Sequence, residues 1–101
     1  MITNQDIKKI YEWAKKTHFP LKKAPTAEGY KRIQIPLRIP DRNHCFMIWD
    51  NKKILWKEGV SQVYPVMDVT HEGYNLSTKP MEFVMIDVKL DTIVENETYS
   101  Q

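Results

Sequence analysis

The feature that most constrains this chain is the hairpin pattern of residues 44–57, in which two apolar segments, 45–49 and 54–56, are joined by the polar residues 50–53. Closing this turn with two or four residues pairs Trp49 with Ile54 and Met47 with Trp56. Because side chains alternate between the two faces of a strand, this pairing divides the apolar residues into two sets. One set is Cys45, Met47, Trp49, Ile54 and Trp56, and the other is Phe46, Ile48 and Leu55. The sequence therefore predicts a hairpin that is apolar on both faces.

Such a hairpin must be covered on both sides to be stable as a folded unit. One helix is predicted, over residues 4–17, because apolar residues recur there at helical spacing and Thr3 or Asn4 can cap its first turn. One helix can cover only one face of a sheet. The second face of the hairpin must then be covered by curling of the sheet, by a loop, or by another molecule.

The remaining segments predict further strands. Apolar and polar residues alternate from 30 to 39, which predicts a half-buried strand, and Pro36 within it predicts a sheet edge or a bulge. Residues 60–70 predict a weaker strand, 71–80 a polar loop, and 81–93 a final strand. The expected fold class is α+β, with the N-terminal helix packed on an antiparallel sheet of four to five strands, flat or curled toward a barrel.

A chain of 101 residues is long enough for one core, which we place in residues 1–94, with 95–101 as a polar tail that frays. The longest unbroken apolar run, Cys45 to Trp49, is far shorter than the roughly 20 residues of a membrane-spanning helix. The first residues do not resemble a secretory signal, and a single cysteine suits a reducing compartment. We therefore expect a cytoplasmic protein that does not contact a membrane.

No pattern in the chain predicts catalysis, a metal or a cofactor. His44 and Cys45 are adjacent, but neighbours on a strand point to opposite faces and cannot act as base and nucleophile. The three histidines, His18, His44 and His71, lack the spacing of common metal sites. The three glycines are isolated, so no phosphate-binding loop is present. We expect a protein that is not an enzyme.

The hairpin is the first candidate for a binding surface. Aromatic side chains supply much of the binding energy at protein interfaces, and methionine adapts its shape to a partner. The residues expected to contact a protein partner are Phe46, Ile48, Leu55, Trp49 and Trp56. The expected function is a small protein-binding module, an adaptor, inhibitor or regulator of the kind that phages and other mobile elements encode. Its partner is another protein or, in a homodimer, a second copy.

The basic half of the chain is the alternative candidate. Residues 1–57 contain 13 Lys and Arg against five Asp and Glu, whereas residues 58–101 carry a net charge of −6. Cations beside an aromatic ring can bind phosphates and stack on bases. The residues expected at a nucleic-acid interface are Lys9, Trp13, Lys16, Lys22, Lys23, Arg32 and Arg38. The acidic half opposes this function, which we therefore rank second.

Overall fold

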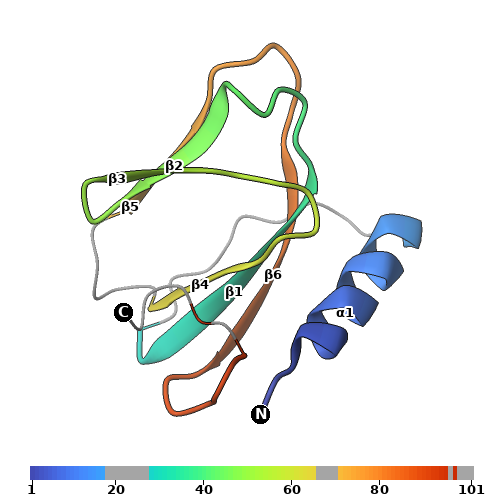
Figure 1. Cartoon of the computed structure of the whole chain (residues 1–101), viewed down its shortest axis with the longest axis vertical. Coiled ribbons are helices and arrows are strands. Elements are labelled where there is room, and N and C mark those ends of the chain that lie inside the picture. The colour runs from blue at the N-terminus through green and yellow to red at the C-terminus, as the bar shows by residue number, and fades with distance from the viewer. Residues whose placement is uncertain (18–27, 66–70, 96, 98–101) are drawn as a thin grey trace.

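The computed structural model describes residues 1–17, 28–65, 71–95 and 97, which form one helix and six strands (Figure 1). The elements are α1 (Asn4–Lys16), β1 (Tyr30–Arg38), β2 (Cys45–Trp49), β3 (Lys52–Leu55), β4 (Gln62–Pro65), β5 (His71–Asn75) and β6 (Glu82–Lys89). The strands form two three-stranded antiparallel sheets, with the orders β4-β1-β6 and β3-β2-β5. The α+β class is confirmed. The structure does not support one sheet of four to five strands or a curl toward a barrel.

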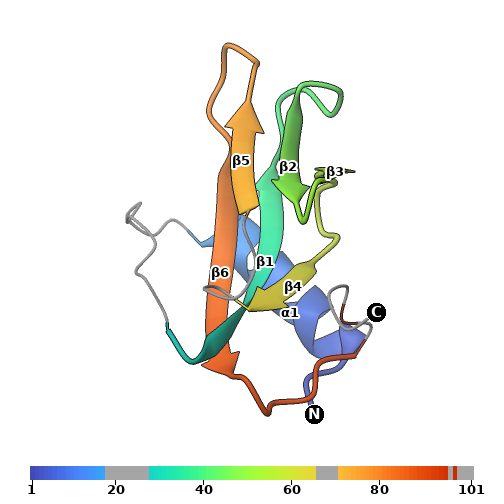
Figure 2. The same ribbon diagram turned by 90° about the vertical axis from the view of Figure 1, so that its left-hand side faces the viewer.

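Helix α1 ends one residue short of its predicted range and is otherwise confirmed. Its first turn is closed by a capping box, in which the Asp6 backbone N–H donates to the Thr3 hydroxyl and the Thr3 N–H donates to the Asp6 carboxylate. Ile7 and Ala14 are buried, and Figure 2 shows α1 lying behind β1 and β4. The helix therefore covers one face of the sheet β4-β1-β6.

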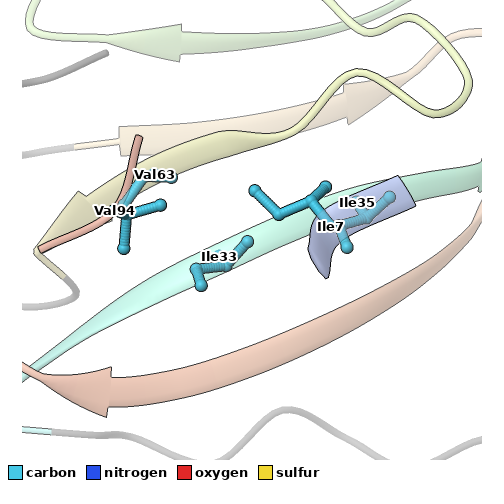
Figure 3. Close-up of a cluster of buried hydrophobic side chains, with 5 residues drawn as sticks. All are labelled: Ile7, Ile33, Ile35, Val63 and Val94. Atoms are coloured by element: carbon cyan, nitrogen blue, oxygen red, sulfur yellow. The ribbon is translucent and has the colours of Figure 1, made fainter. Parts of the chain in front are cut away.

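The first core lies between α1 and this sheet. Its buried residues are Ile7, Ile33, Ile35, Val63 and Val94 (Figure 3). They come from the helix, from β1 and β4, and from the segment that follows β6. Two backbone hydrogen bonds hold that segment to the start of the chain, from the Ile2 N–H to the Ile93 oxygen and from the Glu95 N–H to the Ile2 oxygen, both 2.8 Å. Residues 93–95 and the residues that precede α1 thus lie side by side at this core.

Strand β1 differs from the predicted half-buried strand, because all its residues from Lys31 to Leu37 are buried. It is the central strand of its sheet, so the edge position inferred from Pro36 is wrong. The alternative prediction of a bulge is confirmed, since the pairing with β6 shifts register between Pro36 and Arg38. The Pro36 carbonyl accepts a hydrogen bond from the Gly59 N–H at 2.9 Å. Both faces of β1 are covered, and this explains why its polar side chains are buried.

The second sheet supplies the cover for the other face of β1. A second core contains the buried residues Cys45, Met47, Trp56 and Tyr64, with Phe83 and other half-buried residues packed against it. The Trp56 and Phe83 rings meet edge to face, with their centroids 4.8 Å apart. The Trp56 indole N–H donates to the Gln34 side-chain oxygen at 3.0 Å. The molecule therefore has three layers, which are α1, the sheet β4-β1-β6 and the sheet β3-β2-β5 (Figure 1).

The hairpin β2-β3 is confirmed, but its predicted register is wrong by two residues. Asp50 and Asn51 form a two-residue turn with positive φ at both positions, 50° and 63°, as in a type I′ turn. Trp49 therefore pairs with Lys52, and Met47 pairs with Ile54. A shift of two residues leaves every side chain on its face, so the predicted division of the apolar residues into two sets is retained.

Strand β5 replaces the first half of the predicted loop 71–80. Its residues carry no apolar alternation, which is why the sequence did not predict a strand. They form a strand by pairing along the whole of β2, from Cys45↔Asn75 to Trp49↔His71. Strands β4 and β6 lie within the predicted ranges 60–70 and 81–93, and residues 66–70 lie outside the described residues.

The boundary between the predicted domain, 1–94, and the predicted tail, 95–101, stays a prediction. Glu95 accepts hydrogen bonds from the backbone and side chain of Asn4. Glu97 forms an ion pair with the buried Lys31 and accepts from the Val94 N–H. Residues 96 and 98–101 lie outside the described residues. Two residues of the predicted tail are therefore bonded to the first core, Glu95 to the start of α1 and Glu97 to β1.

Candidate protein-binding surface

The sheet β3-β2-β5 has an inner face on the second core and an outer face that turns away from it. The outer face consists of Lys53, Leu55, Phe46, Ile48, Glu72 and Tyr74. Four of these side chains are exposed, including Leu55 at 49% and Tyr74 at 36%, and Phe46 and Ile48 are half-buried. The type I′ turn and the pairing with β5 therefore bring an apolar group together on a solvent-facing side of the molecule.

The pairing of the three strands arranges this outer face in two rows. In one row, Leu55, Phe46 and Tyr74 lie side by side across β3, β2 and β5. In the next row, Lys53, Ile48 and Glu72 lie side by side in the same order. The central strand is thus apolar, and the second row carries a cation at one sheet edge and an anion at the other.

Direct contacts order the side chains of the outer face. The Phe46 and Tyr74 rings stack with centroids 5.2 Å apart and planes 25° from parallel. The Lys53 ammonium lies 4.4 Å from the centroid of the Phe46 ring. The Tyr74 hydroxyl donates a hydrogen bond to the Glu72 carboxylate, and this bond together with the negative charge raises the pKa of Tyr74. The stacked rings and the hydrogen bond between Tyr74 and Glu72 order part of the surface before a partner binds.

The structure brings together three of the five residues predicted to bind a partner, namely Phe46, Ile48 and Leu55. The two tryptophans lie on the inner face instead. Trp56 is only 4% exposed and belongs to the second core. Trp49 is half-buried, and among the described residues its buried indole N–H has no hydrogen-bond acceptor.

Three residues of the outer face were missed by sequence reasoning: Lys53, Glu72 and Tyr74. Lys53 was assigned to the turn, and the other two to a polar loop. The spacing of Glu72 and Tyr74 is that of one strand face, but the intervening Gly73 and the following Asn75 are typical of turns. The spacing of Glu72 and Tyr74 was therefore too weak a signal to predict a strand.

The residues of the alternative nucleic-acid surface are dispersed. Lys9, Trp13 and Lys16 are exposed on α1, with Trp13 at 56%. Arg32 is buried, and its guanidinium donates to both carboxylate oxygens of Asp87 at 2.8 and 3.0 Å. Arg38 is exposed on β1 and pairs with Glu82 at 3.6 Å. Lys22 and Lys23 lie outside the described residues.

His44 lies in the turn that leads into β2, which begins at Cys45, so the prediction that the two are neighbours on one strand is not confirmed. The His44 Nδ1 is 2.7 Å from the Asp41 carboxylate, and this hydrogen bond lowers the pKa of Asp41. The Cys45 thiol is buried and donates to the Asn75 side-chain oxygen at 3.4 Å. The imidazole and the thiol therefore have separate hydrogen-bond partners.

Within the described ranges, no three His, Cys, Asp or Glu side chains are grouped as metal ligands would be. The one helix in those ranges does not have the length and apolar character needed to cross a membrane. Comparisons of the chain with protein-family models, curated proteins and solved structures find no significant match. The function must therefore be argued from the surfaces of the molecule itself.

Proposed function

We propose that this protein is a small non-catalytic protein-binding module, an adaptor, inhibitor or regulator, and that it binds through the outer face of the sheet β3-β2-β5. The observation that carries this proposal is the group of Phe46, Ile48, Leu55 and Tyr74 on the solvent-facing side of a sheet whose other side is already packed. Large apolar and aromatic side chains in a contiguous group supply most of the energy of protein interfaces.

The distribution of charge on this face also suits a protein partner. Phe46 and Ile48 occupy the central strand, while Lys53 and Glu72 lie on the two edge strands. Protein interfaces commonly have an apolar centre and a polar rim. The face is roughly 15 Å across in each direction, from strand rise and spacing. Its area of roughly 200 Å² is well below the about 800 Å² per partner of a standard interface. It therefore suits a weak or transient complex.

The proposal is tested by affinity capture from the native cell with two matched variants. Leu55→Asp places a charge on β3, at the end of an outer-face row, and Leu90→Asp makes the same change at a 42% exposed leucine in the turn just after β6. Both variants are first checked for native circular dichroism. We expect Leu55→Asp to capture about tenfold less partner protein, or lower still, than the wild type and Leu90→Asp capture. Equal capture by all three would contradict the proposal.

A second candidate function, nucleic-acid binding, is favoured by the exposure of Trp13 between Lys9 and Lys16 on α1. Its test is the anisotropy of labelled single-stranded DNA and RNA at salt concentrations from about 50 to 200 mM. Affinity that falls steeply with salt, and that Lys9→Gln and Lys16→Gln both weaken, would support it. Absence of binding at the lowest salt would remove it.

A further inference from the structure

We infer that the occupant of the outer face is a second copy of this chain, related to the first by a twofold axis that runs along β2. The inference rests on the proposed function and specifies the partner. Its basis is the self-complementary pattern of charge on the face. A closed twofold interface requires one surface patch to complement itself, and the strand pairing shows that this patch does.

The two rows of the outer face determine which residues meet in such a dimer. A twofold axis along β2 places β3 of one copy opposite β5 of the other and leaves each row facing its own equivalent. Phe46 and Ile48, on the axis, then face their own counterparts. Leu55 faces the Tyr74 ring of the second copy. The apolar residues of both copies therefore meet at the centre of the interface.

The charged residues select this axis over the alternative. Lys53 and Glu72 both pair with Ile48, so they occupy the same level on opposite edges of the sheet. With the axis along β2, Lys53 of each copy lies opposite Glu72 of the other, which forms two ion pairs. An axis perpendicular to the strands and midway between the two rows would instead place Lys53 opposite Leu55 and Glu72 opposite Tyr74, and would form neither ion pair. An arrangement in which opposite charges face each other is favoured over one that leaves both charges without a partner.

The side chains can bridge the distance between the two sheets. Packed sheets lie about 10 Å apart, a gap that one lysine and one glutamate reaching from opposite sides can span. In the single chain, Lys53 lies over the Phe46 ring and Glu72 accepts from Tyr74. Dimerisation moves the Lys53 ammonium from the ring to the carboxylate of the second copy. The hydroxyl of Tyr74 keeps that carboxylate in place.

The dimer is expected to be weak, because the face is small compared with standard interfaces. Association also has to offset the loss of translational and rotational freedom. We expect a dissociation constant of about 0.1 to 1 mM, which sedimentation equilibrium can measure with concentrated protein.

The test exchanges the two charges. Lys53→Glu and Glu72→Lys each place like charges opposite one another and are expected to weaken dimerisation at least about fivefold. The combined variant, Lys53→Glu with Glu72→Lys, restores opposite charges and is expected to return to within about twofold of the wild type. Lys79→Glu and Asp91→Lys make the same changes in net charge at exposed positions outside the outer face and are expected to have little effect.

Three outcomes would overturn the inference. The first is a wild-type protein that stays monomeric to about 1 mM, the second is a dimer that none of the charge variants affects, and the third is a combined variant that does not recover. If the protein is monomeric and Leu55→Asp still abolishes capture of a cellular protein, the occupant is a different protein. That result overturns the inference and leaves the proposed function standing.

Discussion

At the scale of single residues, Gly73 of β5 lies close to the ring of Trp56, the residue that follows β3. A β-carbon added at Gly73 would lie 3.0 Å from the Cη2 atom of the Trp56 ring. Such a distance is well inside ordinary van der Waals contact. Glycine at this position therefore allows β5 to pass over the indole, and so allows Tyr74 and Glu72 to reach the outer face.

Gly73→Ala is expected to lower the free energy of unfolding by about 1 to 3 kcal/mol, because the new methyl group overpacks the second core. Urea denaturation measures the change. In a Trp56→Phe background the same substitution should lower the free energy of unfolding clearly less, since the smaller ring leaves room for the methyl group. An equal cost in both backgrounds would show that the clash is not the cause.

The buried ion pair between Arg32 and Asp87 gives a second prediction at this scale. Asp87→Ala leaves the guanidinium buried without its carboxylate, which we expect to lower the free energy of unfolding by about 3 kcal/mol. Glu82→Ala, on the same strand, removes the partner of the exposed Arg38 and should cost at most about 1 kcal/mol. Similar losses from the two variants would contradict the burial of Arg32.

At the scale of elements, the capping box of α1 makes a prediction about pH. The Thr3 backbone N–H and the Thr3 hydroxyl lower the pKa of Asp6 from 3.8. A carboxylate with a lowered pKa stabilises the folded protein above pH 3.8, and that stabilisation is lost as the pH falls through the lowered value. Thr3→Ala removes the hydroxyl, so the pKa of Asp6 should rise part of the way toward 3.8 in an NMR titration. Thr17→Ala, at the other end of the helix, should leave the pKa of Asp6 unchanged.

Local patterns predicted the elements whose own residues specify them. The apolar stripe and cap of α1, and the two apolar segments around Asp50 and Asn51, were sufficient to predict a helix and a hairpin. The register was wrong because the sequence allows several turn lengths, and only the backbone shows that Asp50 and Asn51 adopt positive φ. Strand β5 was missed because its pairing with β2 is a long-range contact that its own sequence does not encode.

At the scale of the whole molecule, the division into two sheets was not predictable from the chain alone. The buried Arg32 and Gln34 look like solvent-facing residues in sequence, and only their partners Asp87 and Trp56 explain their burial. The predicted apolar second face of the hairpin was correct in its residues Phe46, Ile48 and Leu55. Trp49 and Trp56 were predicted to contact a partner because periodicity does not show which face of the hairpin is turned inward.

The most direct test of the proposed binding surface is photo-crosslinking from a single position in the native cell. A photoreactive phenylalanine derivative is placed at Leu55 on the outer face, or at Leu90, in the turn just after β6, as the matched exposed position. We predict protein adducts from Leu55, including a dimer of this chain if the partner is a second copy, and few or none from Leu90. Adducts that form equally at both positions, or only at Leu90, would contradict the proposal.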